Sequence, residues 1–298
     1  MDQYTTDALK KWKEYCFRPV EIPFARAVKS LGTADELIVA KQSETRPNEW
    51  TLCYAGTSNP AIFVYAGVFA EAHPYATGNL VWGKSPIPEG LDEDRIARHA
   101  SFKCAYSYAI ETFHDKEIWT LQEEMDAYMD NVPGFNPRRM MRREWQNGST
   151  YHWRYWFRVP MFLTCETRGG IRPDPPAGLH DWVAAAHKRS KMYRANPVRP
   201  EVCGLEGGRV QPISECTPNV LEYGDIVSIV FTLMYVENRE DWGPIPMVTN
   251  IVRVRRANRD AYPLPSVSAL PVPETPNLGL PMGTVIVDGM RGLSCSFF

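Results

Sequence analysis

Apolar and polar residues alternate along several stretches of the chain, and this pattern predicts strands with one buried face. The longest such run in the first two thirds of the chain spans residues 149–166. Its alternation places Tyr151, Trp153, Tyr155, Phe157 and Val159 on one face and His152, Arg154, Trp156 and Arg158 on the other. Shorter runs predict strands at 36–41, 50–54, 61–69 and 102–110, although alanines in the last of these would also suit a helix. A β-rich fold is therefore expected.

The strongest strand signal in the chain lies at residues 225–236 and 247–254. A polar connection that contains Gly243 and Pro244 separates the two runs. Glycine and proline interrupt regular strands, so the pattern predicts a hairpin with a long tip.

Apolar residues recur at spacings of three and four in other segments, which predicts amphipathic helices at about 5–17, 119–130 and 179–193. Residues 261–282 contain six prolines and favour an extended backbone, with a short strand at 284–287. The predicted fold is α+β, mainly antiparallel β-sheet (sandwich or barrel-like), with peripheral helices and an extended Pro-rich C-terminal tail. Residues 1–260 are expected to form a single β-rich domain, or two sub-units split near 131–149, and residues 261–298 the tail.

Composition and charge narrow the class of protein. With 298 residues, 44% hydrophobic and 23% charged, the chain has the composition of a folded protein. A net charge of -2 gives no overall attraction to nucleic acid or to a membrane, so any such binding needs a local patch. The first 13 residues lack the apolar core of a signal peptide, and no apolar run reaches 18 residues. We expect an intracellular protein of the cytoplasm or nucleus, not secreted and with no membrane partner.

Motifs for catalysis and metal binding are missing from the sequence. The seven cysteines form no CxxC pair and no histidine pair has ligand spacing, so no metal and no cofactor is predicted. His114, Asp115 and Glu117 are the nearest group for acid–base chemistry, but they also read as the polar start of the helix that follows. The sequence does not decide whether the chain is an enzyme, but the missing motifs favour a non-enzymatic protein.

Charge is strongly segregated along the chain. Between Glu111 and Asp130 lie seven acidic residues and one lysine, and between Arg138 and Arg158 lie six arginines and one glutamate. Arginine binds phosphate in a bidentate manner and exposed rings stack on unpaired bases. The alternation of Arg154, Trp156 and Arg158 therefore predicts a site for single-stranded nucleic acid. The predicted site consists of Arg138, Arg139, Arg142, Arg143, Arg154, Trp156, Arg158, Arg253 and Arg255.

Three other interpretations compete with a nucleic-acid site. The arginines would instead pair with the acidic helix at 111–130, while Trp156 packs under a helix or a partner chain. A self-assembling, coat-like protein is the alternative function: its aromatic surplus, including 9 Trp and 14 Tyr, would form contacts in a homo-oligomer and its tail would wrap a neighbouring subunit. An enzyme with a dispersed site is the third.

The segment from Gly224 to Arg255 (GDIVSIVFTLMYVENREDWGPIPMVTNIVRVR) carries two resemblances. Its long apolar strand, polar tip and returning strand resemble the strand pair of OB-type single-stranded DNA-binding proteins. The same segment resembles part of uncharacterised proteins of mushroom-forming fungi. The first resemblance implies a DNA-binding β fold, and neither assigns a role to an individual residue.

Overall fold

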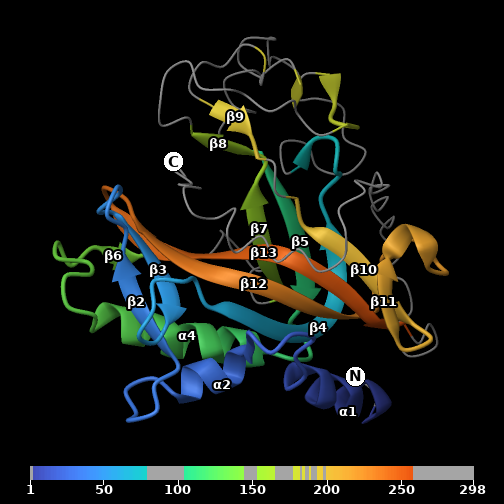
Figure 1. The fold of residues 1–298 in the computed structure, drawn as a ribbon, viewed down its shortest axis with the longest axis horizontal. Coiled ribbons are helices and arrows are strands. Elements are labelled where there is room, and N and C mark those ends of the chain that lie inside the picture. The colour runs from blue at the N-terminus through green and yellow to red at the C-terminus, as the bar shows by residue number, and fades with distance from the viewer. Residues whose placement is uncertain are drawn as a thin grey trace.

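A computed structural model describes residues 3–78, 104–143, 153–164, 177–181, 183–184, 188, 193–196 and 199–257. Its main feature is one 11-stranded sheet with helices on its outside, so the predicted β-rich α+β class is confirmed (Figure 1). The helices are α1 (Gln3–Lys13), α2 (Phe24–Lys29) and α4 (Glu117–Asp130), with a 3₁₀ turn η3 (Ile213–Glu215). The strands of this sheet are β1 (Glu21–Pro23), β2 (Ile38–Gln42), β3 (Glu49–Tyr54), β4 (Ile62–Ala72), β5 (Ala105–Glu111), β6 (Met141–Arg142), β7 (Arg154–Pro160), β10 (Glu201–Glu206), β11 (Arg209–Pro212), β12 (Ile226–Glu237) and β13 (Asp241–Arg255).

The main path of the sheet runs in the order β11-β10-β13-β12-β4-β5-β7, and most neighbours are antiparallel. Three parallel pairs make it a mixed sheet: β1 with β4, β10 with β13 and β6 with β13. A separate antiparallel pair joins β8 (Phe162–Thr164) to β9 (Tyr193–Ala195). The sheet curls, so that β7 packs against β13, but among the described strands the path does not close into a barrel.

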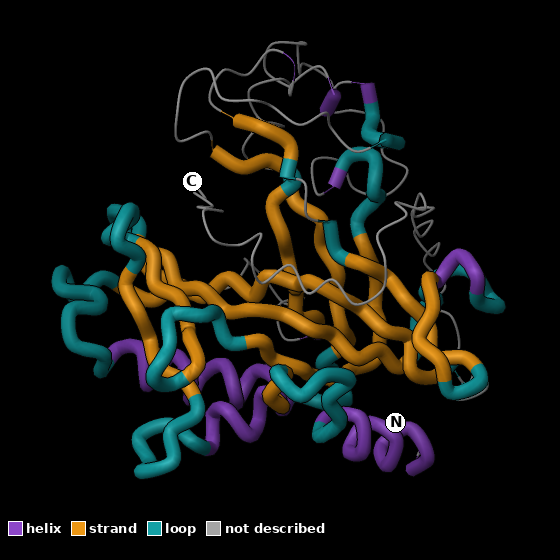
Figure 2. The backbone as a smooth tube through the Cα atoms, viewed as in Figure 1, coloured by secondary structure: helices purple, strands orange, loops and turns teal. Residues whose placement is uncertain are grey.

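The interior of the curl is filled with aromatic side chains that alternate along the strands. Phe63, Phe157 and Phe231 are fully buried, and the Phe231 ring centroid lies 5.6 Å from that of Phe63 and 5.0 Å from that of Phe157. Helices α2 and α4 add Phe24 and Met125 to the same core. In Figure 2 the helices lie along one side of the sheet, and the β8–β9 pair lies beyond the other.

The predicted hairpin is present as β12 and β13, but the prediction of a long tip is wrong. The tip has only three residues, Asn238 to Glu240, because β13 begins at Asp241. Pro244 pairs with Tyr235 within the ladder. Proline is accepted in a strand where its nitrogen faces an edge without a partner strand. Between Trp242, which pairs with β6, and Asn250, which pairs with β10, the outer edge of β13 is unpaired among the described residues.

The predicted helix at 5–17 is present but ends at Lys13, and the helix at 119–130 is confirmed as α4. The ambiguous segment at 102–110 forms strand β5. The long strand predicted at 149–166 is interrupted at Met161, between β7 and β8. In the segment at 179–193, helical backbone occurs at 181, 183–184 and 188, and Tyr193 already belongs to β9.

Strands on both sides of the segment 131–149 belong to the same sheet, and the domain boundaries stay a prediction. The proline-rich tail at 261–298 and its strand at 284–287 lie outside the described residues. Across the helices that the structure describes, none combines the length and the apolar character needed to cross a membrane.

Candidate nucleic-acid interface

The alternation predicted for β7 is confirmed. Tyr155 and Phe157 point into the aromatic core, whereas Trp156 belongs to a small cluster with Ala70 and Ala109 on the opposite face. Ala109 is the residue of β5 that pairs with Trp156, so cross-strand neighbours share that face. Arg154 and Arg158 flank Trp156 on it by the same alternation.

Trp156 is buried on this face, with 5% of its surface exposed. Its ring stacks on His73 with centroids 4.7 Å apart and planes inclined by 8°, and the Arg158 guanidinium lies 5.8 Å from the ring centroid. Burial, followed by the charge of Arg158, lowers the pKa of His73 to about 4. Burial also lowers the pKa of Arg158. The Trp156 ring is thus a packing surface for His73 rather than an exposed platform for a base.

Arg154 makes an ion pair with Glu71 of β4, and not with the acidic helix. The Arg154 side chain remains 41% exposed, whereas that of Glu71 is 11% exposed. Burial raises the pKa of Glu71, and Arg154 opposes that effect. The exposed part of the Arg154 guanidinium is able to contact a phosphate while the ion pair with Glu71 stays in place, because a guanidinium has five N–H donors. Removing Arg154 from the pair would leave the largely buried Glu71 carboxylate without this partner.

Arg142 does pair with the acidic helix, through Asp126 of α4, so the alternative of internal pairing is correct for this residue. Asp126 is 4% exposed and accepts hydrogen bonds from the Tyr235 hydroxyl at 2.6 Å and from Gln122 Nε2 at 2.7 Å. The Gln122 side-chain oxygen in turn accepts a bond from the Tyr155 hydroxyl at 2.7 Å. Burial outweighs these partners and raises the pKa of Asp126 to about 6.

Replacing Asp126 by asparagine is expected to change how stability depends on pH. An unfolded aspartate titrates near 4, so the folded state binds the proton more tightly, and the contribution of Asp126 to the free energy of unfolding falls as pH rises from about 4 to 6. The full difference is about 3 kcal/mol, since each tenfold change in proton affinity is worth about 1.4 kcal/mol. Urea unfolding at pH 4, 5, 6 and 7 measures this difference, as the free energy of unfolding of the wild type minus that of Asp126→Asn. A difference that stays constant across these pH values would contradict the prediction.

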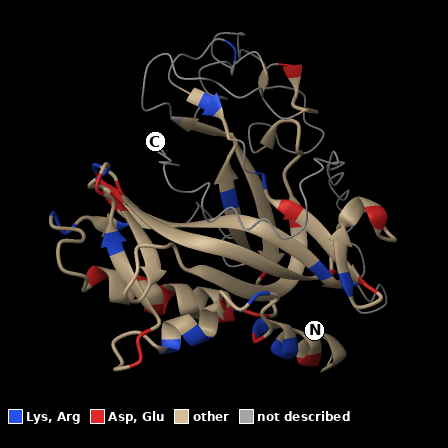
Figure 3. Cartoon of the chain, viewed as in Figure 1, with Lys and Arg blue, Asp and Glu red and all other residues tan. Residues whose placement is uncertain are grey.

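The other basic residues of the predicted site are dispersed over the fold. Arg143 pairs with Asp241 at 2.8 Å near the hairpin tip, and Arg253 is 2% exposed inside the sheet. The Arg255 guanidinium stacks on the ring of Tyr4, 3.1 Å from its centroid. Arg138 and Arg139 are exposed in the loop after α4. Figure 3 shows basic and acidic segments interspersed along the ribbon.

Two exposed aromatic side chains outside the predicted site lie at the start of β7. The alternation placed Trp153 on the apolar face, but Trp153 precedes the first residue of β7 and is exposed. Phe113 and Trp153 are 57% and 51% exposed, and their ring centroids are 6.0 Å apart with planes inclined by 86°. The pairing of β5 with β7 brings them together, because the Thr112 amide donates to the Trp153 carbonyl at 2.8 Å. We call Phe113, Trp153 and Arg154 the ring surface.

Hydrogen bonds and a ring contact hold the segment that carries Phe113. Glu111 Oε1 accepts hydrogen bonds from the amides of Phe113 and His114, and the His114 ring packs edge-on against Phe113 at 4.9 Å. Within the described residues, no group of three His, Cys, Asp or Glu side chains is arranged to hold a metal ion.

Solved structures that are similar to this chain include single-stranded DNA-binding proteins of bacteriophages. That of bacteriophage Enc34 shares 11% identity at a TM-score of 0.32, with 74% of this chain and 90% of that chain covered. The same protein in complex with single-stranded DNA shares 12% at 0.31, with 74% and 97% covered. The bacteriophage T7 protein shares 12% at 0.31, with 68% and 97% covered. No family is assigned. No protein-family model and no curated protein matches the sequence.

These neighbours belong to the class that the Gly224–Arg255 segment resembles in sequence, whereas the fungal resemblance stays a prediction. TM-scores of 0.31–0.32 are too low to transfer a function.

Proposed function

We propose that this protein binds single-stranded nucleic acid at the ring surface, where bases stack on Phe113 and Trp153 and the backbone contacts Arg154. The observation that carries the proposal is the exposure of two adjacent large rings, 57% and 51%, at the start of the strand that carries the 41% exposed side chain of Arg154. Base–aromatic stacking contributes about 1–3 kcal/mol per base and tolerates any sequence, because every base has a π face.

Strand β7 offers the geometry that such a site needs. In the described part of the sheet β7 is the last strand of the path, with β5 as its one ladder partner, so a polynucleotide can follow it without crossing another strand. Arg154 and Arg158 lie on one face of this strand, spaced by four residues. Arg154, the more exposed of the two, is therefore proposed to contact a phosphate with the donors that its ion pair with Glu71 leaves exposed, whereas Arg158 lies against the buried ring of Trp156.

Helix α1 extends the aromatic surface. Lys13 Nζ lies 2.5 Å from Asp115 Oδ2 and 2.6 Å from Glu117 Oε2, which holds the end of α1 against the segment that carries Phe113. Just beyond Lys13, Tyr15 is 44% exposed and packs edge-on against Trp12 at 4.9 Å. A strand that leaves Phe113 in this direction would meet a further ring.

Fluorescence anisotropy with labelled single-stranded oligonucleotides tests the proposal. Phe113→Ala and Trp153→Ala should each weaken binding by roughly 5- to 100-fold, the equivalent of one lost stacking contact. Tyr4→Ala is the matched control, since Tyr4 is a 61% exposed ring in α1, stacked on Arg255 outside the ring surface. Arg154→Gln should reduce the slope of log affinity against log salt by about one counterion. No binding of any oligonucleotide at low salt, or wild-type binding by both ring variants, would refute the proposal.

A contact between copies of the chain is the other use that two exposed rings permit, and homo-oligomer formation stays a prediction. Light scattering of the wild type and of Trp153→Ala separates the two uses. If the ring surface joins copies, the substitution lowers the molecular mass; if it binds nucleic acid, the mass is unchanged and the affinity falls.

A further inference from the structure

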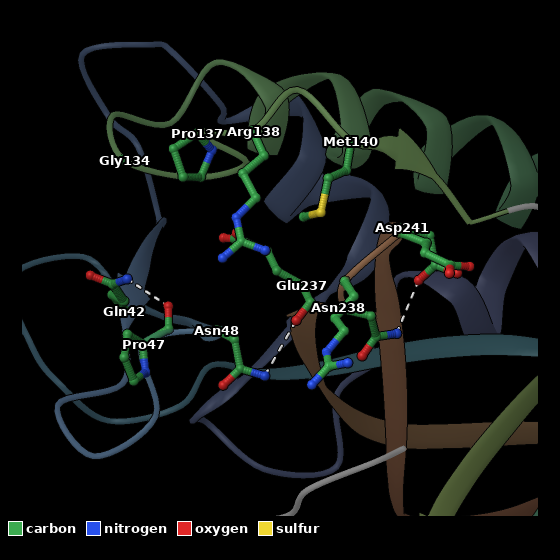
Figure 4. A pocket seen from close by; sticks show the side chains of 12 residues that line it. Gln42, Pro47, Asn48, Gly134, Pro137, Arg138, Met140, Glu237, Asn238 and Asp241 are labelled. Atoms are coloured by element: carbon green, nitrogen blue, oxygen red, sulfur yellow. Dashed lines mark hydrogen bonds between the residues drawn. The ribbon is translucent and has the colours of Figure 1, made fainter.

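A large cleft opens at the hairpin tip, at the other end of β12 from the residues that pair with β4 (Figure 4). Its volume is about 840 Å³, which is within the range of clefts that bind small molecules. The walls come from the β2–β3 turn, the loop after α4 and the hairpin tip. The residues that line this tip cleft are Gln42, Pro47, Asn48, Gly134, Pro137, Arg138, Met140, Glu237, Asn238, Arg239, Glu240 and Asp241.

Two of the three carboxylates in the tip cleft already accept hydrogen bonds from side chains of the protein. Asp241 Oδ1 accepts hydrogen bonds from Arg143 and from Asn238 Nδ2, and these bonds lower the pKa of Asp241. Glu237 Oε1 accepts a bond at 3.0 Å from the indole N–H of Trp50. These contacts hold the hairpin tip in place and leave Glu240, at the exposed rim, as the third carboxylate.

The two arginines of the tip cleft, in contrast, have no carboxylate partner among the described residues. Arg138 reaches from the loop after α4 into the space between the walls (Figure 4), and Arg239 lines that space from the hairpin tip. Both are exposed, and neither makes an ion pair with any carboxylate of the described residues. They differ in this from Arg142, Arg143 and Arg253, each of which has a carboxylate partner.

The loop that presents Arg138 has an unusual backbone. Asn136 and Arg139 have positive φ angles of 47° and 52°, in the left-handed region that costs an ordinary side chain about 1–2 kcal/mol. The Asn136 side chain holds the loop by accepting from the Met140 amide at 2.7 Å and donating to the Met140 carbonyl at 3.1 Å. These bonds hold the backbone of the loop, from which Arg138 lines the tip cleft whereas its neighbour Arg139 does not.

We propose that the tip cleft binds an organic phosphate of nucleotide size. Arg138 and Arg239 would hold the phosphate groups, because guanidinium groups pair with phosphate through two parallel hydrogen bonds. Pro47, Pro137 and Met140 supply an apolar wall against which a base packs. This site uses none of the ring surface and goes beyond the proposed function.

The amides at the lower wall fit the polar edge of a base. Asn48 Nδ2 donates to the Glu237 carbonyl at 3.3 Å, and Gln42 Nε2 donates to the Pro47 carbonyl at 2.6 Å (Figure 4). Each amide nitrogen is turned to the backbone, which leaves the amide oxygen of the same side chain to accept from an exocyclic amine of the ligand.

Isothermal titration with ATP, AMP, adenosine and inorganic phosphate tests the tip cleft. We expect ATP to bind more tightly than AMP, and adenosine to bind too weakly to measure. Arg138→Gln and Arg239→Gln should each raise the ATP dissociation constant by about tenfold or more, since hydrogen bonds to a charged partner are involved. Glu240→Gln should lower it severalfold by removing a like charge from the rim. Arg139→Gln, next to Arg138 but outside the lining, is the matched control.

Three outcomes would overturn the proposal: no heat of binding with ATP, adenosine binding as well as ATP, or Arg139→Gln weakening ATP binding as much as Arg138→Gln. The last would mean that general positive charge, and not the tip cleft, attracts the nucleotide. Phe113→Ala and Trp153→Ala should leave ATP binding unchanged. Loss of oligonucleotide binding and loss of ATP binding are therefore separate results from separate variants.

Discussion

Replacing Phe231 by alanine is expected to lower the free energy of unfolding by about 3–5 kcal/mol, the cost of deleting a buried aromatic ring together with the cavity that it leaves. Phe231 is fully buried at the centre of the curled sheet. Its ring contacts Phe24, Phe63 and Phe157 at centroid distances of 5.4, 5.6 and 5.0 Å, so helix α2 and three strands lose packing at once.

Urea unfolding followed by tryptophan fluorescence measures this loss. The matched control is Phe113→Ala, which removes the same side chain from a position that is 57% exposed. Substitutions at exposed positions change stability by about 0.5 kcal/mol, so this variant should unfold near the wild-type midpoint. Equal losses for the two variants would mean that the curled sheet does not enclose Phe231.

The alternation of residues in the sequence predicted the longer strands of the sheet, but not the shorter strands β1, β6, β9, β10 and β11. In β7 the apolar set Tyr155, Phe157 and Val159 lies in the core as expected, because the period of a strand is two regardless of what it packs against. Helix α4 was predicted for a similar reason, since its spacing places Leu121, Met125 and Met129 on one buried side.

Contacts between distant segments were not predictable in the same way. Trp156 is buried because His73 of another segment stacks on it, and Arg154 pairs with Glu71 of β4 rather than with the acidic helix. The local pattern of residues 149–166 does not indicate that His73 and Glu71 are these partners. The β5–β7 pairing likewise decides that Phe113 and Trp153 are neighbours, although an apolar ring within the polar segment around Phe113 was a signal that could have been used.

At the hairpin tip, the general rule that glycine and proline interrupt strands led to a predicted tip that was too long. Gly243 and Pro244 usually interrupt a strand. Here Pro244 and Pro246 occupy alternate positions, so their nitrogens share the edge of β13 that has no partner strand in the described sheet. The same prolines remove amide donors from an open edge, which hinders pairing with another chain.

Replacing Arg253 by methionine is expected to destabilise the fold by about 3 kcal/mol or more, as removal of one partner from a buried ion pair does. Arg253 is 2% exposed, donates to the Val220 carbonyl at 2.8 Å and lies 4.0 Å from Asp225. Asp225 is fully buried, and burial raises its pKa even with Arg253 present. Without the guanidinium, the Asp225 carboxylate keeps only hydrogen bonds from backbone amides, those of Glu222 and Ala257, among its partners in the described residues.

Arg143→Met is the control for this loss, because the Arg143–Asp241 pair is about one third exposed at both side chains and should contribute less than about 1 kcal/mol. Chemical unfolding of both variants gives the comparison. Both arginines stand in basic segments of the sequence, yet the structure assigns Arg253 to the interior of the sheet. At a temperature where Arg253→Met remains folded, it should bind oligonucleotides as the wild type does. If Arg253→Met is stable but binds oligonucleotides more weakly than the wild type, Arg253 belongs to the nucleic-acid site instead.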